Sequence, residues 1–115
     1  QRIVEASRSS DMEKLGVTLI AASSTDMSCD DVCATKGRHC KQDLLYLANT
    51  CAALRSLFAC MKGCHDSIGA EQPAVVDDAA PSGHTKGVCL YSSNIATSTC
   101  EAKHKYTRRA CVCGV

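Results

Sequence analysis

Ten of the 115 residues are cysteine, and all of them lie at or after Cys29. Cysteine at this density in a short chain is typical of secreted domains that are held together by disulfides. The even number allows complete pairing, so we expect every cysteine to be disulfide-bonded. They are Cys29, Cys33, Cys40, Cys51, Cys60, Cys64, Cys89, Cys100, Cys111 and Cys113. Because a reducing cytosol would open such bonds, the sequence predicts a secreted protein or one in the lumen of the secretory pathway.

The other residues explain why cross-links would be needed. The chain has no Trp, a single Phe and three Tyr, and these large side chains supply much of the buried area of a core. A small domain with a small core needs such a supplement. The net charge of +1 gives no electrostatic case for nucleic-acid binding. No stretch approaches the roughly 20 apolar residues of a membrane helix, and no apolar leader opens the chain, so neither a membrane span nor a signal peptide is expected.

We expect a single cysteine-rich domain over residues 28–115, preceded by an N-terminal arm over residues 1–27. The arm begins with polar and charged residues, which favours a segment that is held only by a partner in an assembly. A β-rich run at residues 16–21 predicts one short strand within it.

The domain is predicted to be a small disulfide-rich α+β fold. A first helix is expected over residues 28–37, because Ser28 can cap it, Asp30 and Asp31 suit its first turn, and Gly37 can end it. Apolar residues three and four apart predict helix over residues 42–62, either continuous or broken near Asn49. Short strands are expected at residues 87–91 and 109–114, and residues 65–88 are expected to form an irregular surface loop.

Metal and redox chemistry are the first alternatives to a disulfide scaffold. The pairs Cys29/Cys33, Cys60/Cys64 and Cys111/Cys113 are spaced closely enough to ligate zinc. Such a site would leave several cysteines unused, and a secretory compartment oxidises them. A Cys-x-x-Cys redox motif is absent from the sequence. We therefore expect no metal and no cofactor.

Catalysis by acid–base or nucleophilic groups is not expected either. The chain lacks Gly-x-Ser-x-Gly, His-Glu-x-x-His and a glycine-rich phosphate loop. The acids Asp77 and Asp78 lie in the predicted loop and are expected to be solvated. The same is expected of the four scattered histidines, His39, His65, His84 and His104. The sequence thus predicts a protein that is not an enzyme.

A basic run near the C-terminus is the strongest candidate for a binding site. Residues 103–109 contain four cations, and these are Lys103, Lys105, Arg108 and Arg109. They could contact an anionic glycan, a phosphate or an acidic protein. The interpretation that we favour from the sequence is an exposed loop without a partner, closed by Cys100 and Cys111, because the rest of the chain adds no second basic stripe. Among the four, Arg108 and Arg109 are the strongest candidates for an ionic contact.

The cysteine spacing adds a resemblance to a known family. Cys29-x3-Cys33-x6-Cys40 and Cys89-x10-Cys100-x10-Cys111-x-Cys113 resemble the cysteine-rich C-terminal module of the N-acetylglucosaminyltransferase V family, and similar secreted domains of protists and algae. The resemblance extends over residues 28–113. The chain departs from the family in two respects. Val112 stands where the family commonly has proline, and the spacing of Cys51, Cys60 and Cys64 differs. In that family the chemistry belongs to a separate α/β domain, so the resemblance implies a fold and a compartment but no catalytic residue.

These observations lead to one expected function and two alternatives. We expect a non-catalytic, secreted or lumenal module that binds a protein or a glycan, or builds an extracellular assembly. The first alternative is an accessory C-terminal domain of a lumenal glycosyltransferase. The second is a secreted effector or protease inhibitor that acts through residues 71–86. The pairing of the cysteines is left open among about 945 combinations, but we expect Cys29 and Cys33 to bond the region of Cys111 and Cys113, because the chain ends of stapled domains are commonly tied together.

Overall fold

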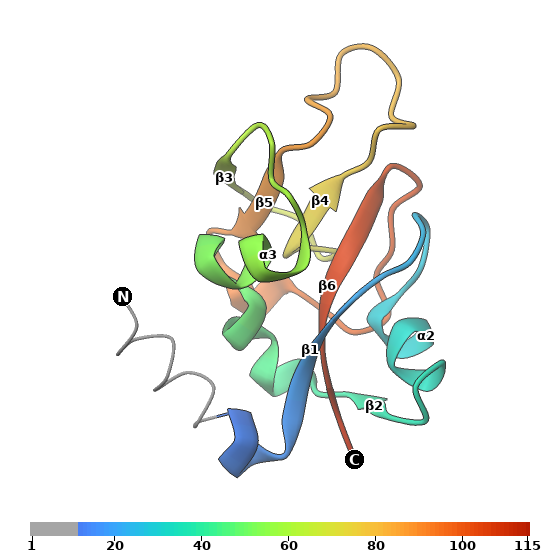
Figure 1. The fold of residues 1–115 in the computed structure, drawn as a ribbon, viewed down its shortest axis with the longest axis vertical. Helices are drawn as coiled ribbons and strands as arrows, with labels where there is room; N and C mark the ends of the chain where they lie inside the picture. Colours follow the sequence, from blue (N-terminus) through green and yellow to red (C-terminus); the bar gives the residue numbers. More distant parts are fainter. Residues whose placement is uncertain (1–11) are drawn as a thin grey trace.

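The computed structural model describes residues 12–115, so residues 1–11 of the predicted arm lie outside the described part. It confirms a small α+β fold with a six-stranded mixed sheet. The elements, drawn in Figure 1, are β1 (Val17–Ala21), α2 (Cys29–Ala34), β2 (His39–Cys40), the 3₁₀ helix η1 (Gln42–Ala48), α3 (Cys51–Leu57), β3 (Cys64–Ser67), β4 (Ala74–Val76), β5 (Cys89–Ser92), the 3₁₀ helix η2 (Ile95–Thr97) and β6 (Thr107–Gly114). No helix within residues 12–115 has the length and apolar character that crossing a membrane requires.

The sheet is organised around β6, which runs through the middle of the molecule (Figure 1). On one side β6 pairs with β1, antiparallel, from Val17 opposite Gly114 to Ala21 opposite Ala110. On the other side it pairs with β4 and with the short β2. The strand order is β1-β6-β4-β5-β3, and β3 is parallel to β5, so β1 and β3 form the two edges.

Both faces of β6 are buried, and its sequence alternates accordingly. Ala110 and Val112 belong to the larger core, with Leu45 and Leu54 of the helices on one face. Cys111 and Cys113 belong to a second cluster, which includes α2 on the other face. Successive side chains of a strand point to opposite faces, so one strand serves two cores. Figure 1 shows the result, with α2 and α3 on opposite sides of β6.

The first helix begins as its sequence predicts and ends earlier. The Oγ of Ser28 accepts a hydrogen bond from the N–H of Asp31, 3.0 Å away, and caps α2. Regular helix ends at Ala34 instead of residue 37. The Arg38 N–H donates to the Cys33 carbonyl, and Gly37 has φ +67°, a conformation that glycine adopts without strain.

The helix predicted over residues 42–62 is confirmed only in part. Of the two alternatives, a continuous helix or one broken near Asn49, the second is observed, and the two parts are η1 and α3. The helix ends at Leu57, because Phe58 is extended and Cys60 has φ +47°. Cys60 and Cys64 therefore do not share a helix face, and Cys64 begins β3. Each bonds a different partner, and these tertiary links override the local spacing.

Three predicted strands are present, and three further strands, the two-residue β2 among them, were not predicted. The observed strands corresponding to 16–21, 87–91 and 109–114 are β1, β5 and β6, with ends that differ by one or two residues. The irregular loop expected between Cys64 and Cys89 instead contains β3 and the buried β4. With only three residues, β4 is too short to show an alternating pattern, so its burial depends on contacts with β5 and β6.

Candidate interaction site

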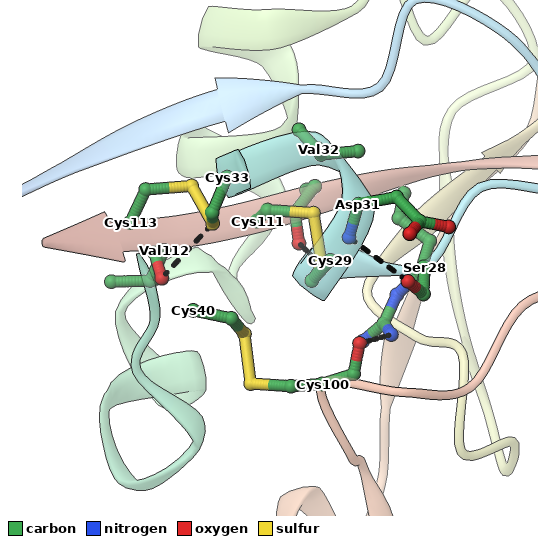
Figure 2. Close-up of a disulfide and its surroundings, with 12 residues drawn as sticks. Ser28, Cys29, Asp31, Val32, Cys33, Cys40, Cys100, Cys111, Val112 and Cys113 are labelled. Atoms are coloured by element: carbon green, nitrogen blue, oxygen red, sulfur yellow. Dashed lines mark hydrogen bonds between the residues drawn. A yellow bond between two sulfur atoms is a disulfide. The ribbon is translucent and has the colours of Figure 1, made fainter. Parts of the chain in front are cut away.

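All ten cysteines form disulfides, as the sequence predicts. The pairs are Cys29–Cys111, Cys33–Cys113, Cys40–Cys100, Cys51–Cys64 and Cys60–Cys89. The expected link between the first helix and the closing Cys-x-Cys is confirmed twice (Figure 2). These bonds fix the basic run between two anchored points, Cys100 and Cys111.

The two bonds between α2 and β6 are possible because helix and strand geometry match. Four residues of α-helix rise about 6 Å, and two residues of a strand rise about 6.6 Å. Cys29 and Cys33 are four apart on α2, whereas Cys111 and Cys113 are two apart on β6. Figure 2 shows α2 running alongside β6 with both bonds between them. The spacing of Cys29 and Cys33, which resembles that of a zinc ligand pair, thus allows two disulfides to join α2 to β6.

Arg109 is fully buried, so the prediction that it contacts a partner is wrong. Its Nη1 donates hydrogen bonds to the carbonyls of Thr99 at 2.6 Å, Ala102 at 2.7 Å and Cys100 at 3.4 Å. Burial lowers the pKa of Arg109 to about 10, while the charges of Glu71 and Asp30 oppose that shift. Arg109 therefore remains cationic at neutral pH and positions the backbone that leads to Lys103.

Arg108 lies on the other face of β6 and does not join the lysines. Its guanidinium carbon is 5.2 Å from the centre of the Phe58 ring, a cation–π arrangement. It lines a hollow of about 250 Å³ that also includes the residues Asp77 and Asp78. Neighbouring residues of a strand point to opposite faces, so Arg108 and Arg109 cannot act on one partner surface. The four predicted cations do not form one site.

Lys103 and Lys105 are exposed and remain available to a partner. Lys105 Nζ lies 5.0 Å from the centre of the Tyr106 ring. Tyr106 is held in place because it packs against the apolar cluster of Val76 and Val88. Its backbone carbonyl accepts a hydrogen bond from the Asp77 N–H, 2.9 Å away. Lys105 is thus displayed beside a fixed aromatic ring.

Two histidines also contact the Tyr106 ring, and the sequence did not predict these contacts. The ring centres of His84 and His104 lie 5.1 Å and 5.6 Å from that of Tyr106, both in edge-on geometry. The Nδ1 of His104 accepts a hydrogen bond from the Tyr106 N–H at 3.0 Å, so its second nitrogen, Nε2, carries the proton of the neutral ring. His84 is twenty-odd residues away in the chain, and no spacing rule links it to Tyr106.

We call this group the Tyr106 surface and define it by five residues: His84, Lys103, His104, Lys105 and Tyr106. Its side chains offer ammonium and imidazole donors beside one aromatic face. Such a combination can hold a carboxylate or sulfate group while the ring contacts an apolar portion of the ligand. The surface is held by the neighbouring Cys100 disulfide, by Arg109, and by the Asp26 N–H, which donates to the His104 carbonyl at 3.0 Å.

A second hollow lies elsewhere on the molecule. It measures about 440 Å³ and is lined by Gln42, Asp43, Tyr46, Ile95, Ala96 and Ser98. Tyr46 is about half exposed there. The acidic side chain of Asp43 beside this ring makes the hollow a poor fit for an anionic ligand.

Only one group of potential metal ligands occurs within residues 12–115, and its chemistry does not suit a metal. Ligand atoms of Asp30, Cys40 and Cys100 lie within 4.8 Å of one another. The two sulfurs are bonded to each other, and a metal ligand must be a free thiolate. Oxidised cysteines leave a single carboxylate, which is too few ligands for a protein metal site.

No family model matches the chain, and no curated protein matches it. The resemblance of the cysteine spacing to the glycosyltransferase module therefore stays a prediction.

Proposed function

We propose that the chain is a non-catalytic, secreted or lumenal module that binds an acidic glycan or an acidic protein through the Tyr106 surface. The observation that carries this proposal is the display of Lys105 beside a ring held by His84, His104 and the apolar cluster of Val76 and Val88, with the exposed Lys103 next to His104 in the chain. Lysines on a fixed segment lose less conformational freedom on binding than lysines on a mobile tail.

The disulfide framework supports the compartment and the mode of action. Five disulfides use every cysteine, which favours an oxidising environment such as the secretory lumen or the extracellular space. A domain stapled in this way keeps its binding surface ordered before a partner arrives. Pre-organisation of this kind improves affinity by lowering the entropy cost of binding.

The binding experiment uses the oxidised chain and two immobilised probes, heparin for sulfated glycans and poly-glutamate for acidic polypeptides. We expect retention on at least one probe, weakening as salt rises, because exposed ionic contacts are screened. The double variant Lys103→Glu/Lys105→Glu should elute at clearly lower salt. The matched control is Lys36→Glu, which reverses an exposed charge beyond the end of α2 and should elute with a smaller shift.

A second pair of variants separates the aromatic contribution from the charge. Tyr106→Ala should weaken binding, whereas Tyr46→Ala, in the other hollow, should not. If Tyr46→Ala weakened binding and Tyr106→Ala did not, the binding site would be the second hollow and not the Tyr106 surface. If wild type were retained on neither probe, the proposed partner chemistry would be wrong.

The compartment is tested by the mass of the native protein before and after reduction. Five disulfides lower the mass by ten hydrogens relative to the reduced chain, and no thiol should react with an alkylating agent beforehand. Free thiols in native material would contradict an oxidising compartment.

One observation favours the glycosyltransferase accessory domain as a second candidate. Of the seven cysteines that carry the resemblance, six pair among themselves, in the bonds Cys29–Cys111, Cys33–Cys113 and Cys40–Cys100. The resembling segments therefore form one closed network. The test is the length of the native protein: an α/β catalytic domain on the same chain would support this candidate, and a native protein without one would exclude it.

A further inference from the structure

The disulfide between Cys51 and Cys64 differs from the other four in its accessibility. Neither of its cysteines is buried, whereas each other disulfide contains at least one buried cysteine. The reason is its position, since Cys51 is the first residue of α3 and Cys64 begins the edge strand β3. An attacking thiolate must reach a sulfur, so exposure raises the rate of exchange at this bond relative to the others.

A cation lies against one of its two sulfur atoms. The Nε of Arg55 is 3.2 Å from the Sγ of Cys51 and donates to it. Arg55 follows Cys51 by four residues in α3, the spacing that brings two side chains to the same helix face. A guanidinium so placed would stabilise a thiolate on Cys51 more than the neutral sulfur of the intact bond. Cys64 has no such contact among the hydrogen bonds of residues 12–115.

We propose that Cys51–Cys64 is a thiol–disulfide exchange site, at which an external thiolate attacks Cys64 and Cys51 is the leaving group. The Sγ of Cys64 forms a new bond to the incoming sulfur as the Cys51–Cys64 bond breaks. The electron pair of that bond goes to Cys51, whose thiolate is held by Arg55. The direction follows from the rule that the better-stabilised thiolate leaves faster.

A second thiolate from the donor completes the reduction. It attacks the donor sulfur of the mixed disulfide, releases Cys64 as a thiolate and leaves the donor as a disulfide. Two electrons have then passed from the donor to the protein, and two protons from solvent complete the thiols. The donor is a thiol, either a small one such as glutathione or a dithiol oxidoreductase. Release of this bond would free α3 from β3 while the other four disulfides still hold the sheet.

The test exposes the oxidised chain to limited thiol and identifies which cysteines react first. One arm uses reduced glutathione, and the other a thioredoxin-type protein whose resolving cysteine has been replaced, so that mixed disulfides persist. After acid quenching, alkylation and proteolysis, mass spectrometry locates the label. We expect the alkyl label on Cys51 and the donor on Cys64. First reaction at any other disulfide would overturn the proposal. Reaction in only one arm would identify the thiol source.

The role of Arg55 is tested by Arg55→Gln, with Lys36→Gln as the control that removes an exposed charge beyond α2. Loss of an exposed ionic contact should slow exchange at this bond about two- to fivefold, and the control should match wild type. The second readout is the site of attack, which a purely structural change would not move. Arg55→Gln should distribute the mixed disulfide between Cys64 and Cys51. An unchanged rate with attack still confined to Cys64 would overturn the leaving-group assignment.

Discussion

Arg109 donates a 2.7 Å hydrogen bond from its Nη1 to the carbonyl of Ala102, and this contact connects the buried strand to the exposed basic segment. The same nitrogen also binds the Thr99 carbonyl at 2.6 Å. A charged donor in the interior thus sets the course of the chain immediately before Lys103. The surface lysines depend on a buried arginine that cannot itself touch a partner.

Replacement of Arg109 by Met should therefore disorder the segment before Lys103. Loss of the donor leaves carbonyls unpaired, and we expect the free energy of unfolding to fall by about 1–3 kcal/mol. Hydrogen exchange at the amides of residues 99–103 should increase, as measured by mass spectrometry. The matched control is Arg108→Met, because Arg108 lies on the opposite face against Phe58. Equal exchange in both variants would contradict the positioning role.

The charge of Arg109 predicts a pH profile. Burial lowers its pKa to about 10 in the folded protein, well below its value in the unfolded chain. Between the two values the unfolded chain binds more protons than the folded one, so stability due to this group rises as pH climbs through about 10. Below that range Arg109 is charged in both states and contributes no slope.

Chemical denaturation of wild type and Arg109→Met at several pH values tests whether Arg109 contributes no slope below that range. The stability difference between them should be constant from about pH 6 to pH 9. A difference that changes steeply near neutrality would show that another group, coupled to Arg109, titrates there.

The sequence predicted the elements whose signals are local. Ser28 identified the start of α2, and the β-rich run from Val17 identified β1. The expectation that Cys29 and Cys33 bond the closing Cys-x-Cys was also confirmed. Each of these inferences needed only neighbouring residues or the order of the chain.

The features that were missed depend on contacts between distant segments. Cys60 and Cys64 have helical spacing, yet their disulfide partners draw the chain out of the helix after Leu57. The Tyr106 surface needs His84, which a turn of the chain brings to the ring. Arg109 looked like a surface cation because its neighbours are charged, and only the pairing of β6 shows that it points inward.

Asn49 makes a side-chain bridge that substitutes for a neighbouring strand. Its Nδ2 donates to the Ser92 carbonyl at 2.9 Å, and its Oδ1 accepts from the Ser92 N–H at 2.6 Å. These two bonds mimic the backbone pairing that β5 would otherwise receive at its end. Asn49→Ala should lower the free energy of unfolding by about 1–3 kcal/mol, measured by denaturant titration, because both backbone groups lose their partner.

Asn49→Asp separates the two bonds, since it keeps the acceptor for the Ser92 N–H and removes the donor. Its loss of stability at neutral pH should equal or exceed that of Asn49→Ala, because a carboxylate faces the Ser92 carbonyl. A neutral effect in both variants would mean that water replaces the bridge.

The two disulfides between α2 and β6 should contribute non-additively to the free energy of unfolding. With Cys33–Cys113 intact, Cys29–Cys111 closes only a small ring, made of one helical turn and two strand residues. In the chain-entropy model such a ring of about eight residues contributes about 2.5 kcal/mol. Without its neighbour, either bond would close a ring of roughly 23 residues through the intact Cys40–Cys100 bond, worth about 3.4 kcal/mol. Replacing either pair by Ala should therefore cost the smaller amount. Removing both should exceed the sum of the single losses by about 1 kcal/mol in a double-mutant cycle. The cycle is measured by denaturant unfolding without reductant, and additive losses would mean that the two bonds act on independent parts of the unfolded chain.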